Sequence, residues 1–239
     1  SESNHHYDTG DYHKIDPILG TNDDFKHLID AAKAKGISII IDGVFSHTGE
    51  DSIYFNAFGN YDSVGAAQSK DSLYYDWYDF EQFPKKYRCW WGVPSLPELN
   101  ETDPRYQEYI FHSQTGIVPR WILHGASGWR LDVADELPMD FLRKLRTAAK
   151  HAKRDAVVLG EVWEDASDKV AYNETRCYCA GDTLDSVMNY PLRAAILDFM
   201  TRKTPAASLV RLIQHQAEVY PAVFRYSLMN LIGSHDRAR

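Results

Sequence analysis

Acidic, basic and imidazole side chains stand directly after apolar runs at four separate places in this chain. They are Asp42 and His47, Arg130 and Asp132, Glu161, and His235 and Asp236. In parallel α/β folds, functional groups gather at the carboxyl ends of the strands, so we expect these side chains to converge on one face. Two carboxyl groups brought together there could cleave a glycosidic bond, one as the nucleophile and the other as the general acid.

The spacing of Asp132 and Glu161 narrows this chemistry. They lie 29 positions apart, which is the length of one strand–helix unit, so their strands are expected to be neighbours in a parallel sheet. Because adjacent strands are ~4.8 Å apart, carboxyl groups at matched strand ends would be roughly 5 Å apart. That separation is typical of retaining glycosidases, whereas inverting glycosidases keep their carboxyl groups ~6.5–9.5 Å apart.

The residues beside the two acids suggest a role for each. Arg130, two positions before Asp132 and on the same strand face, should keep Asp132 ionised as a nucleophile. Glu161 is followed by Val162 and Trp163, an apolar setting of the kind that raises a carboxyl pKa and favours a general acid. An Arg-x-Asp pair on a strand is equally typical of a structural ion pair, so that interpretation stays open.

Helical and strand patterns alternate on either side of an irregular stretch. Alternation of helices with buried strands predicts a parallel sheet, either doubly wound or part of a (β/α)₈ barrel. The expected helices are 22–35, 104–124, 138–153, 191–201 and 205–218, and the expected strands are 37–41, 128–134, 156–163, 183–189 and 227–232.

Residues 49–103 have no sustained period and are rich in Tyr, Trp and Phe. We interpret them as an irregular domain inserted after the first strand, between 1–48 and 104–239, which together form the partial barrel. The aromatic pair Trp90–Trp91 is expected to pack inside this insertion, with stacking on a sugar as the alternative. Cys177 and Cys179 are interpreted as passive thiols, and His5, His6 and His13 as surface residues rather than metal ligands.

Composition excludes several classes of function. The chain is 44% hydrophobic and 25% charged with a net charge of −8, so nucleic acid is an unlikely partner. It contains neither a phosphate-binding loop nor an apolar run of the ~20 residues that a membrane helix needs. Three cysteines and no visible signal peptide lead us to expect a cytoplasmic protein.

Five segments resemble the conserved regions of the α-amylase family, glycoside hydrolase family 13. In chain order they are Asp42–His47, Leu96–Asn100 (the region of domain B), Gly128–Asp132, Gly160–Trp163 and Gly233–Asp236. Three further segments are similar in sequence to the cyclomaltodextrinase, neopullulanase and maltogenic amylase branch of this family. They are residues 3–9, 188–192 and 231–236. The resemblance covers essentially the whole chain.

The resemblance implies a partial (β/α)₈ TIM barrel of about strands 3 to 7, with domain B after strand 3. It implies a retaining hydrolase that cleaves α-1,4 and α-1,6 bonds in cyclodextrins, pullulan or maltooligosaccharides through a glycosyl-Asp intermediate, with some transglycosylation. The implied roles are Asp132 as nucleophile, Glu161 as acid/base, Asp236 as transition-state stabiliser, His47, Arg130 and His235 lining the −1 subsite, Tyr7 stacking there, Trp163 on the acceptor side, and Asp42 orienting Arg130.

Two departures from the family pattern concern calcium. Ser46 precedes His47 where the family usually has Asn, a calcium ligand in many members, and Asp135-Glu136 stand where calcium-dependent members have a later His. We therefore expect no metal and no cofactor. Because the motifs run only from after strand 2 to the end of strand 7, the chain resembles a fragment of a catalytic domain, whose parent could be a homodimer.

Two other functions stay open. An α-glucosidase or oligo-1,6-glucosidase would use the same acids, although Leu96–Asn100 differs from the Gln-Pro-Asp that those enzymes tend to have. A catalytically silent amylase-like protein for carbohydrate binding or interaction would be expected to lose the acids that this chain retains. Linkage and chain-length preference are not determined by these motifs.

Overall fold

A four-stranded parallel sheet organises the molecule, which we describe from a computed structural model over residues 3–237. Its strands are β1 (Ile40–Gly43), β4 (Gly128–Leu131), β5 (Val157–Gly160) and β8 (Ser186–Val187), in that spatial order. The register aligns Gly43 with Leu131, and Leu131 with Gly160. Asp132 and Glu161, which directly follow β4 and β5, therefore start from the same level.

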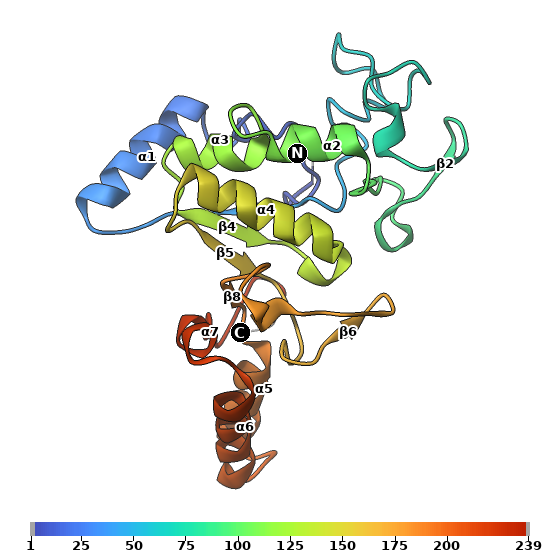
Figure 1. Ribbon diagram of the computed structural model, residues 1–239. Helices are drawn as coiled ribbons and strands as arrows, with labels where there is room; N and C mark the ends of the chain where they lie inside the picture. The colour runs from blue at the N-terminus through green and yellow to red at the C-terminus, as the bar shows by residue number, and fades with distance from the viewer. Residues whose placement is uncertain (1–2, 238–239) are drawn as a thin grey trace.

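Helices cover the sheet and extend beyond it. They are α1 (Asn22–Ala34), α2 (Pro104–Phe111), α3 (Ile117–Leu123), α4 (Met139–Ala152), α5 (Tyr190–Met200), α6 (Ala206–Val219) and α7 (Ala222–Ser227). Helices α2, α3 and α4 pack together beside β4 and β5, whereas the pair α5–α6 projects from the β8 end (Figure 1). Between them and the sheet lies one aromatic and aliphatic core that includes Phe45, Leu131 and Phe141.

Local sequence explains where α1 begins. The Thr21 side chain accepts a hydrogen bond from the Asp24 amide, and the Asp24 carboxylate accepts one from the Thr21 amide. This reciprocal capping box satisfies two amides that have no partner inside the helix. Ile29 and Ala32 then supply the buried face of the helix.

The single helix expected over 104–124 is wrong, because α2 ends at Phe111 and α3 begins at Ile117. Pro119 explains the break. It lacks an amide proton and would clash with the preceding turn in a continuous helix, but it is tolerated in the first turn of a new one. Between the helices, the Gln114 and Thr115 amides donate to the His112 ring.

The strand expected over 227–232 is also wrong. Helix α7 occupies the start of that range, and only Met229 pairs with the sheet, through one parallel bridge to Met188. Its neighbour β8 is two residues long, so it offers few backbone groups for a further strand. The first strand is also shifted, since it begins at Ile40 rather than at 37.

The segment 49–103 holds short regular elements around buried rings. A hairpin joins β2 (Phe80–Gln82) to β3 (Lys86–Tyr87), and 3-10 turns lie at Tyr75–Trp77 and Trp90–Gly92. A bridge between His47 and Glu98 fastens the end of the segment beside β1. A second hairpin, β6 (Val170–Ala171) and β7 (Glu174–Thr175), lies after β5. The division into 1–48 plus 104–239 and an inserted domain 49–103 stays a prediction.

Candidate active site

The side chains of Asp42, Arg130, Asp132 and Glu161 meet at the carboxyl ends of β1, β4 and β5. The ladder continues past the strands, since the Asp132 amide donates to Gly43 and the Glu161 amide donates to Leu131. Asp132 and Glu161 therefore stand side by side, as their spacing predicts. Both are almost fully buried.

One guanidinium contacts all three carboxylates. Arg130 Nη1 donates to Asp42 Oδ1 at 2.9 Å and to Asp132 Oδ1 at 2.7 Å. Arg130 Nη2 lies 2.9 Å from Glu161 Oε2, an ionic contact whose angles fall outside hydrogen-bond geometry. Asp42 thus fixes the outer side of Arg130, which is the geometry that its implied orienting role requires. Arg130 in turn connects the two acids expected to perform the reaction.

The expected electrostatic contrast between Asp132 and Glu161 is wrong. Burial raises the pKa of Asp132 to about 7, although Arg130 acts in the opposite direction and Glu161 adds to the rise. Glu161 is in a polar setting rather than an apolar one, because it accepts hydrogen bonds from the Val133 amide and from Trp163 Nε1, each at 2.9 Å. Sequence reasoning failed here because desolvation depends on the whole site and not on flanking residues.

Val133 reaches Glu161 through an uncommon backbone conformation. Its φ of 39° and ψ of 54° lie in the left-handed region, which a β-branched residue rarely adopts. This conformation turns the Val133 amide toward the Glu161 carboxylate and starts the 3-10 turn Ala134–Glu136. Backbone strain of this kind is concentrated at functional sites.

Tyr7 connects Asp42 to two histidines. Tyr7 Oη donates to Asp42 Oδ2 at 2.9 Å and lies 2.7 Å from His235 Nε2, and the rings of Tyr7 and His235 are stacked at 5.5 Å. His47 is 1% exposed and lies between Ser46 Oγ and the Tyr7 carbonyl oxygen. Burial lowers the pKa of His47 to about 4, so its ring is neutral near pH 7.

Asp236 and Trp163 complete the predicted set. Asp236 Oδ1 lies 3.3 Å from His235 Nε2, and Asp236 is less buried than Asp132 or Glu161. Trp163 stacks on Tyr190 with the ring centroids 4.0 Å apart, and the Arg237 guanidinium lies 4.4 Å from the Trp163 ring.

A pocket of about 890 Å³ opens over these groups, and its size suits an oligosaccharide segment. Six predicted residues line it: Tyr7, His47, Asp132, Glu161, Trp163 and Asp236. Asp42 and His235 contact the lining residue Tyr7, and Arg130 contacts the lining residue Asp132.

Comparison with known proteins identifies the fold to which this site belongs. The family model described as "Alpha amylase, catalytic domain" matches residues 1–239. The chain belongs to the alpha-amylase family. This confirms the family resemblance and, with the parallel sheet and its helices, the partial (β/α)₈ barrel of the catalytic domain.

Among its curated relatives in the alpha-amylase family is an amylopullulanase of Thermoanaerobacterium saccharolyticum, 40% identical over 99% of the chain and 20% of that protein. A cyclomaltodextrinase of Geobacillus thermopakistaniensis is 36% identical over 99% of the chain and 38% of that protein. Neopullulanase 2 of Thermoactinomyces vulgaris is 36% identical over 100% of the chain and 39% of that protein. Cyclomaltodextrinases and neopullulanases are thus present as expected, together with amylopullulanases, which the motifs did not indicate.

A solved structure of the alpha-amylase fold shows the same arrangement. The cyclic alpha-maltosyl-(1→6)-maltose hydrolase of Arthrobacter globiformis superposes with a TM-score of 0.86 at 32% identity. The match covers 99% of this chain and 51% of that one. The chain therefore spans about half the length of this solved structure, and between a fifth and two fifths of the curated relatives above.

The motifs of the alpha-amylase family left several pocket residues unassigned. Trp90, Trp91, Glu136, Tyr172 and Arg237 also line the pocket. Some of these were indicated in part by the sequence. Glu136 lies only four positions after Asp132, and sugar stacking was the alternative interpretation of Trp90–Trp91. Nothing in the sequence indicated Tyr172, because only the β6–β7 hairpin places it here.

The expected absence of a metal and of a cofactor stays a prediction. Within residues 3–237, no group of three or more His, Cys, Asp or Glu side chains is arranged to hold a metal ion. Over the same described range, no helix has the length and apolar character to span a bilayer.

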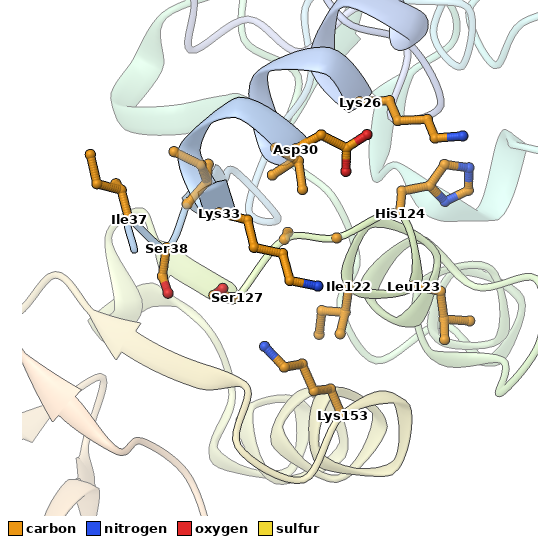
Figure 2. A pocket seen from close by; sticks show the side chains of 14 residues that line it. Lys26, Asp30, Lys33, Ile37, Ser38, Ile122, Leu123, His124, Ser127 and Lys153 are labelled. Atoms are coloured by element: carbon orange, nitrogen blue, oxygen red, sulfur yellow. The ribbon is translucent and has the colours of Figure 1, made fainter. Parts of the chain in front are cut away.

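A second hollow lies at the other end of the strands and differs in chemistry. It has a volume of about 430 Å³ and is bordered by α1, the end of α3 and the residues before β1 and β4. Figure 2 shows Lys33 and Lys153 extending toward the same space, which Ser127 also borders. Asp30 is the one carboxyl group among its lining residues, so this hollow lacks the paired acids found at the carboxyl ends.

Proposed function

We propose that this chain carries the catalytic centre of a retaining α-glucan hydrolase. The observation that carries the proposal is the shared contact of one guanidinium with two buried carboxylates at adjacent strand ends, Asp132 and Glu161. Retaining hydrolysis requires such a pair to lie close together in a pocket that holds the sugar. The pocket of about 890 Å³ over both acids meets that requirement.

The reaction divides into two steps. Asp132 attacks the anomeric carbon as a carboxylate and forms a glycosyl ester, while Glu161 gives its proton to the departing glycosidic oxygen. In the second step Glu161 removes a proton from water, the water oxygen attacks the anomeric carbon, and the Asp132 carboxylate leaves. A sugar hydroxyl in place of water gives transglycosylation.

The electrostatic setting of Asp132 bears on its role as the nucleophile. Burial raises the pKa of Asp132, and the neighbouring Glu161 adds to the rise. Arg130 acts in the opposite direction and favours the ionised form that a nucleophile requires. The contact between Arg130 and Asp132 therefore supports the nucleophilic role of Asp132.

Asp236 and the residues around Tyr7 would hold the sugar that is cleaved. Positive charge develops on the ring carbon and oxygen in the transition state, and the Asp236 carboxylate at the pocket wall can stabilise it. The neutral His47 ring gives its one N–H to the Tyr7 carbonyl oxygen, so it holds Tyr7 in place without introducing a competing charge. Trp163 would contact the sugar on the acceptor side.

The substrates that we propose are cyclodextrins, pullulan and maltooligosaccharides. Relatives are named cyclomaltodextrinase, neopullulanase and amylopullulanase, which supports both cyclic and linear α-glucans. One solved relative is described as hydrolysing cyclic alpha-maltosyl-(1→6)-maltose, and others from Nostoc punctiforme are described as debranching enzymes. These names favour α-1,6 bonds as substrates in addition to α-1,4 bonds.

Product analysis tests the proposal. The protein is incubated with β-cyclodextrin, maltotriose and pullulan, and the first product released is examined by NMR for its anomeric configuration. Retained α configuration, with activity abolished in Asp132→Asn and reduced by about 10²–10⁴-fold in Glu161→Gln, is expected. Asp140→Asn, an exposed acid on α4, serves as the matched control. A β-configured first product, or unchanged activity in Asp132→Asn, contradicts the proposal.

A further inference from the structure

The carboxylate of Glu136 gathers three aromatic side chains at the pocket wall. Trp90 Nε1 donates to Glu136 Oε2 at 2.5 Å, and Trp91 Nε1 donates to Glu136 Oε1 at 2.6 Å. The Tyr172 hydroxyl also hydrogen-bonds to this carboxylate. We call Trp90, Trp91 and Tyr172 the aromatic wall. Both oxygens of Glu136 are therefore used to orient rings.

The aromatic wall is assembled from segments far apart in the sequence. Trp90 and Trp91 come from the 3-10 turn after β3, Tyr172 comes from the β6–β7 hairpin, and Glu136 follows β4. All four residues line the pocket that contains Asp132 and Glu161. Glu136 thus joins the two sides of the pocket mouth at one point.

A row of rings leads outward from the buried part of the site. The His47 and Trp90 ring centroids are 5.2 Å apart, and the Trp90 and Trp91 rings stack at 5.3 Å with an interplanar angle of 21°. His47 is fully buried, whereas Trp91 is 78% exposed. The row therefore passes from the expected −1 subsite to solvent in two steps.

Trp91 and Tyr172 are both exposed to solvent and have an unfavourable backbone conformation. Trp91 is 78% and Tyr172 is 69% exposed, although large apolar rings are stabilised by burial. Both also have a positive φ, 50° for Trp91 and 53° for Tyr172, which bulky side chains rarely adopt. Exposed rings in strained backbone, anchored by one carboxylate, are better explained by a bound partner than by packing.

We propose that Trp91 and Tyr172 are a stacking platform for glucosyl residues beyond the cleaved bond, and that Glu136 is the positioning residue that fixes the platform. The C–H bonds of a glucose ring present an apolar face to an aromatic ring, and a neutral sugar needs no counter-charge. Only a substrate long enough to extend past His47 reaches these rings. The platform therefore favours longer α-glucans, and this inference rests on the proposed function.

Kinetics with short and long substrates test the platform. Stacking of one ring is worth about tenfold in affinity, so Trp91→Ala should raise KM for maltohexaose about tenfold more than KM for p-nitrophenyl α-glucoside. Trp91→Phe keeps a ring but lacks the indole N–H, and should fall between Trp91→Ala and the unaltered protein. Tyr226→Ala, an equally exposed ring on α7 outside the pocket, is the control and should leave both KM values unchanged.

A double-mutant cycle tests the role of Glu136. If Glu136 acts by holding Trp91, then Glu136→Ala reproduces the selective rise in KM, and adding Trp91→Ala to it raises KM little further. Glu136→Gln retains one acceptor oxygen and should restore part of the preference for maltohexaose. Additive effects, or an equal rise in KM for short and long substrates, would overturn the proposal.

A binding measurement separates this inference from the proposed function. Quenching of tryptophan fluorescence by maltohexaose is recorded for the unaltered protein and for Trp91→Ala. Cleavage of maltohexaose with the same KM in both proteins would contradict the stacking platform but agree with the proposed hydrolase function. Quenching that depends on Trp91, without any cleavage, would support the stacking platform and contradict the proposed hydrolase function. Absence of both quenching and cleavage overturns both.

Discussion

Arg130 Nη1 lies 2.7 Å from Asp132 Oδ1, yet burial still raises the pKa of Asp132 to about 7. An arginine beside an aspartate ordinarily lowers its pKa, but here the guanidinium is shared with Asp42 and Glu161, and the burial of Asp132 outweighs its effect. The charge of Arg130 is therefore needed to keep Asp132 ionisable near neutral pH.

Replacement of Arg130 should change the pH dependence of the reaction. Because Arg130 lowers the pKa of Asp132, Arg130→Gln should move the acidic limb of the kcat/KM profile upward by roughly 1–3 pH units. Arg130→Lys retains the charge and should shift the limb less. The profile is measured between pH 4 and 9 with maltotriose. An acidic limb at the same pH in Arg130→Gln and the unaltered protein would contradict the shared-guanidinium account.

His47 should make the fold sensitive to acid. Its pKa is about 4 in the folded state against an ordinary 6.5, so its stabilising contribution is full above pH 6.5 and is lost as the pH falls through 4. The loss amounts to about 3 kcal/mol of unfolding free energy. His47→Gln keeps a donor for the Tyr7 carbonyl oxygen and should remove this acid dependence.

Urea titrations at several pH values measure the His47 contribution. The quantity compared is the difference in unfolding free energy between the unaltered protein and His47→Gln, because other groups cancel in it. The difference should fall as the pH is lowered from 6.5 to 4. A constant difference over that range would show that the ring is not held neutral.

The contribution of Glu101 to stability should depend on pH in the direction opposite to that of His47. It is buried near Glu98 and Glu136, and burial raises its pKa from 4.5 to about 8. Its contribution to stability is present below pH 4.5 and is lost as the pH rises through 8, since the charged form is poorly solvated. Glu101→Gln should therefore be more stable than the unaltered protein at pH 8, by roughly 3–5 kcal/mol, and nearly equal to it at pH 4.5. Thermal unfolding at the two pH values checks this, and equal stability at pH 8 would refute it.

Gly128 should not tolerate a side chain. A Cβ atom there would lie 2.1 Å from the Val157 carbonyl oxygen, which belongs to the backbone and cannot turn aside. Gly128→Ala should lower the unfolding free energy by about 3 kcal/mol or more and separate β4 from β5, the strands that bring Asp132 beside Glu161. Gly59→Ala is the control: its φ of 69° lies in the left-handed region, so it carries backbone strain, but the added Cβ atom would lie 3.5 Å from its nearest neighbour, the flexible Gln68 side chain. Similar losses of unfolding free energy in both variants would show that the clash with the Val157 carbonyl oxygen does not determine the effect of Gly128→Ala.

Much of the fold was predictable because its signals are local. Apolar runs that end in polar residues placed Asp42, Arg130, Asp132 and Glu161 at strand ends, and the α4 pattern gave a helix within one residue of the observed bounds. The break between α2 and α3 was missed although Pro119 marks it. The strand predicted over 227–232 does not form, because strand formation depends on a partner and β8 offers only two residues.

The sequence by itself determined which side chains are available for catalysis and the family to which the chain belongs, because motif order and strand ends are properties of the chain. Only the tertiary structure decided how those groups act. In the folded protein the Arg130 guanidinium contacts three carboxylates, and burial raises the pKa of Asp132. Folding also brings Trp91 and Tyr172 to the Glu136 carboxylate. The physical reason is that desolvation and side-chain contact depend on segments that meet only after folding, which flanking residues do not encode.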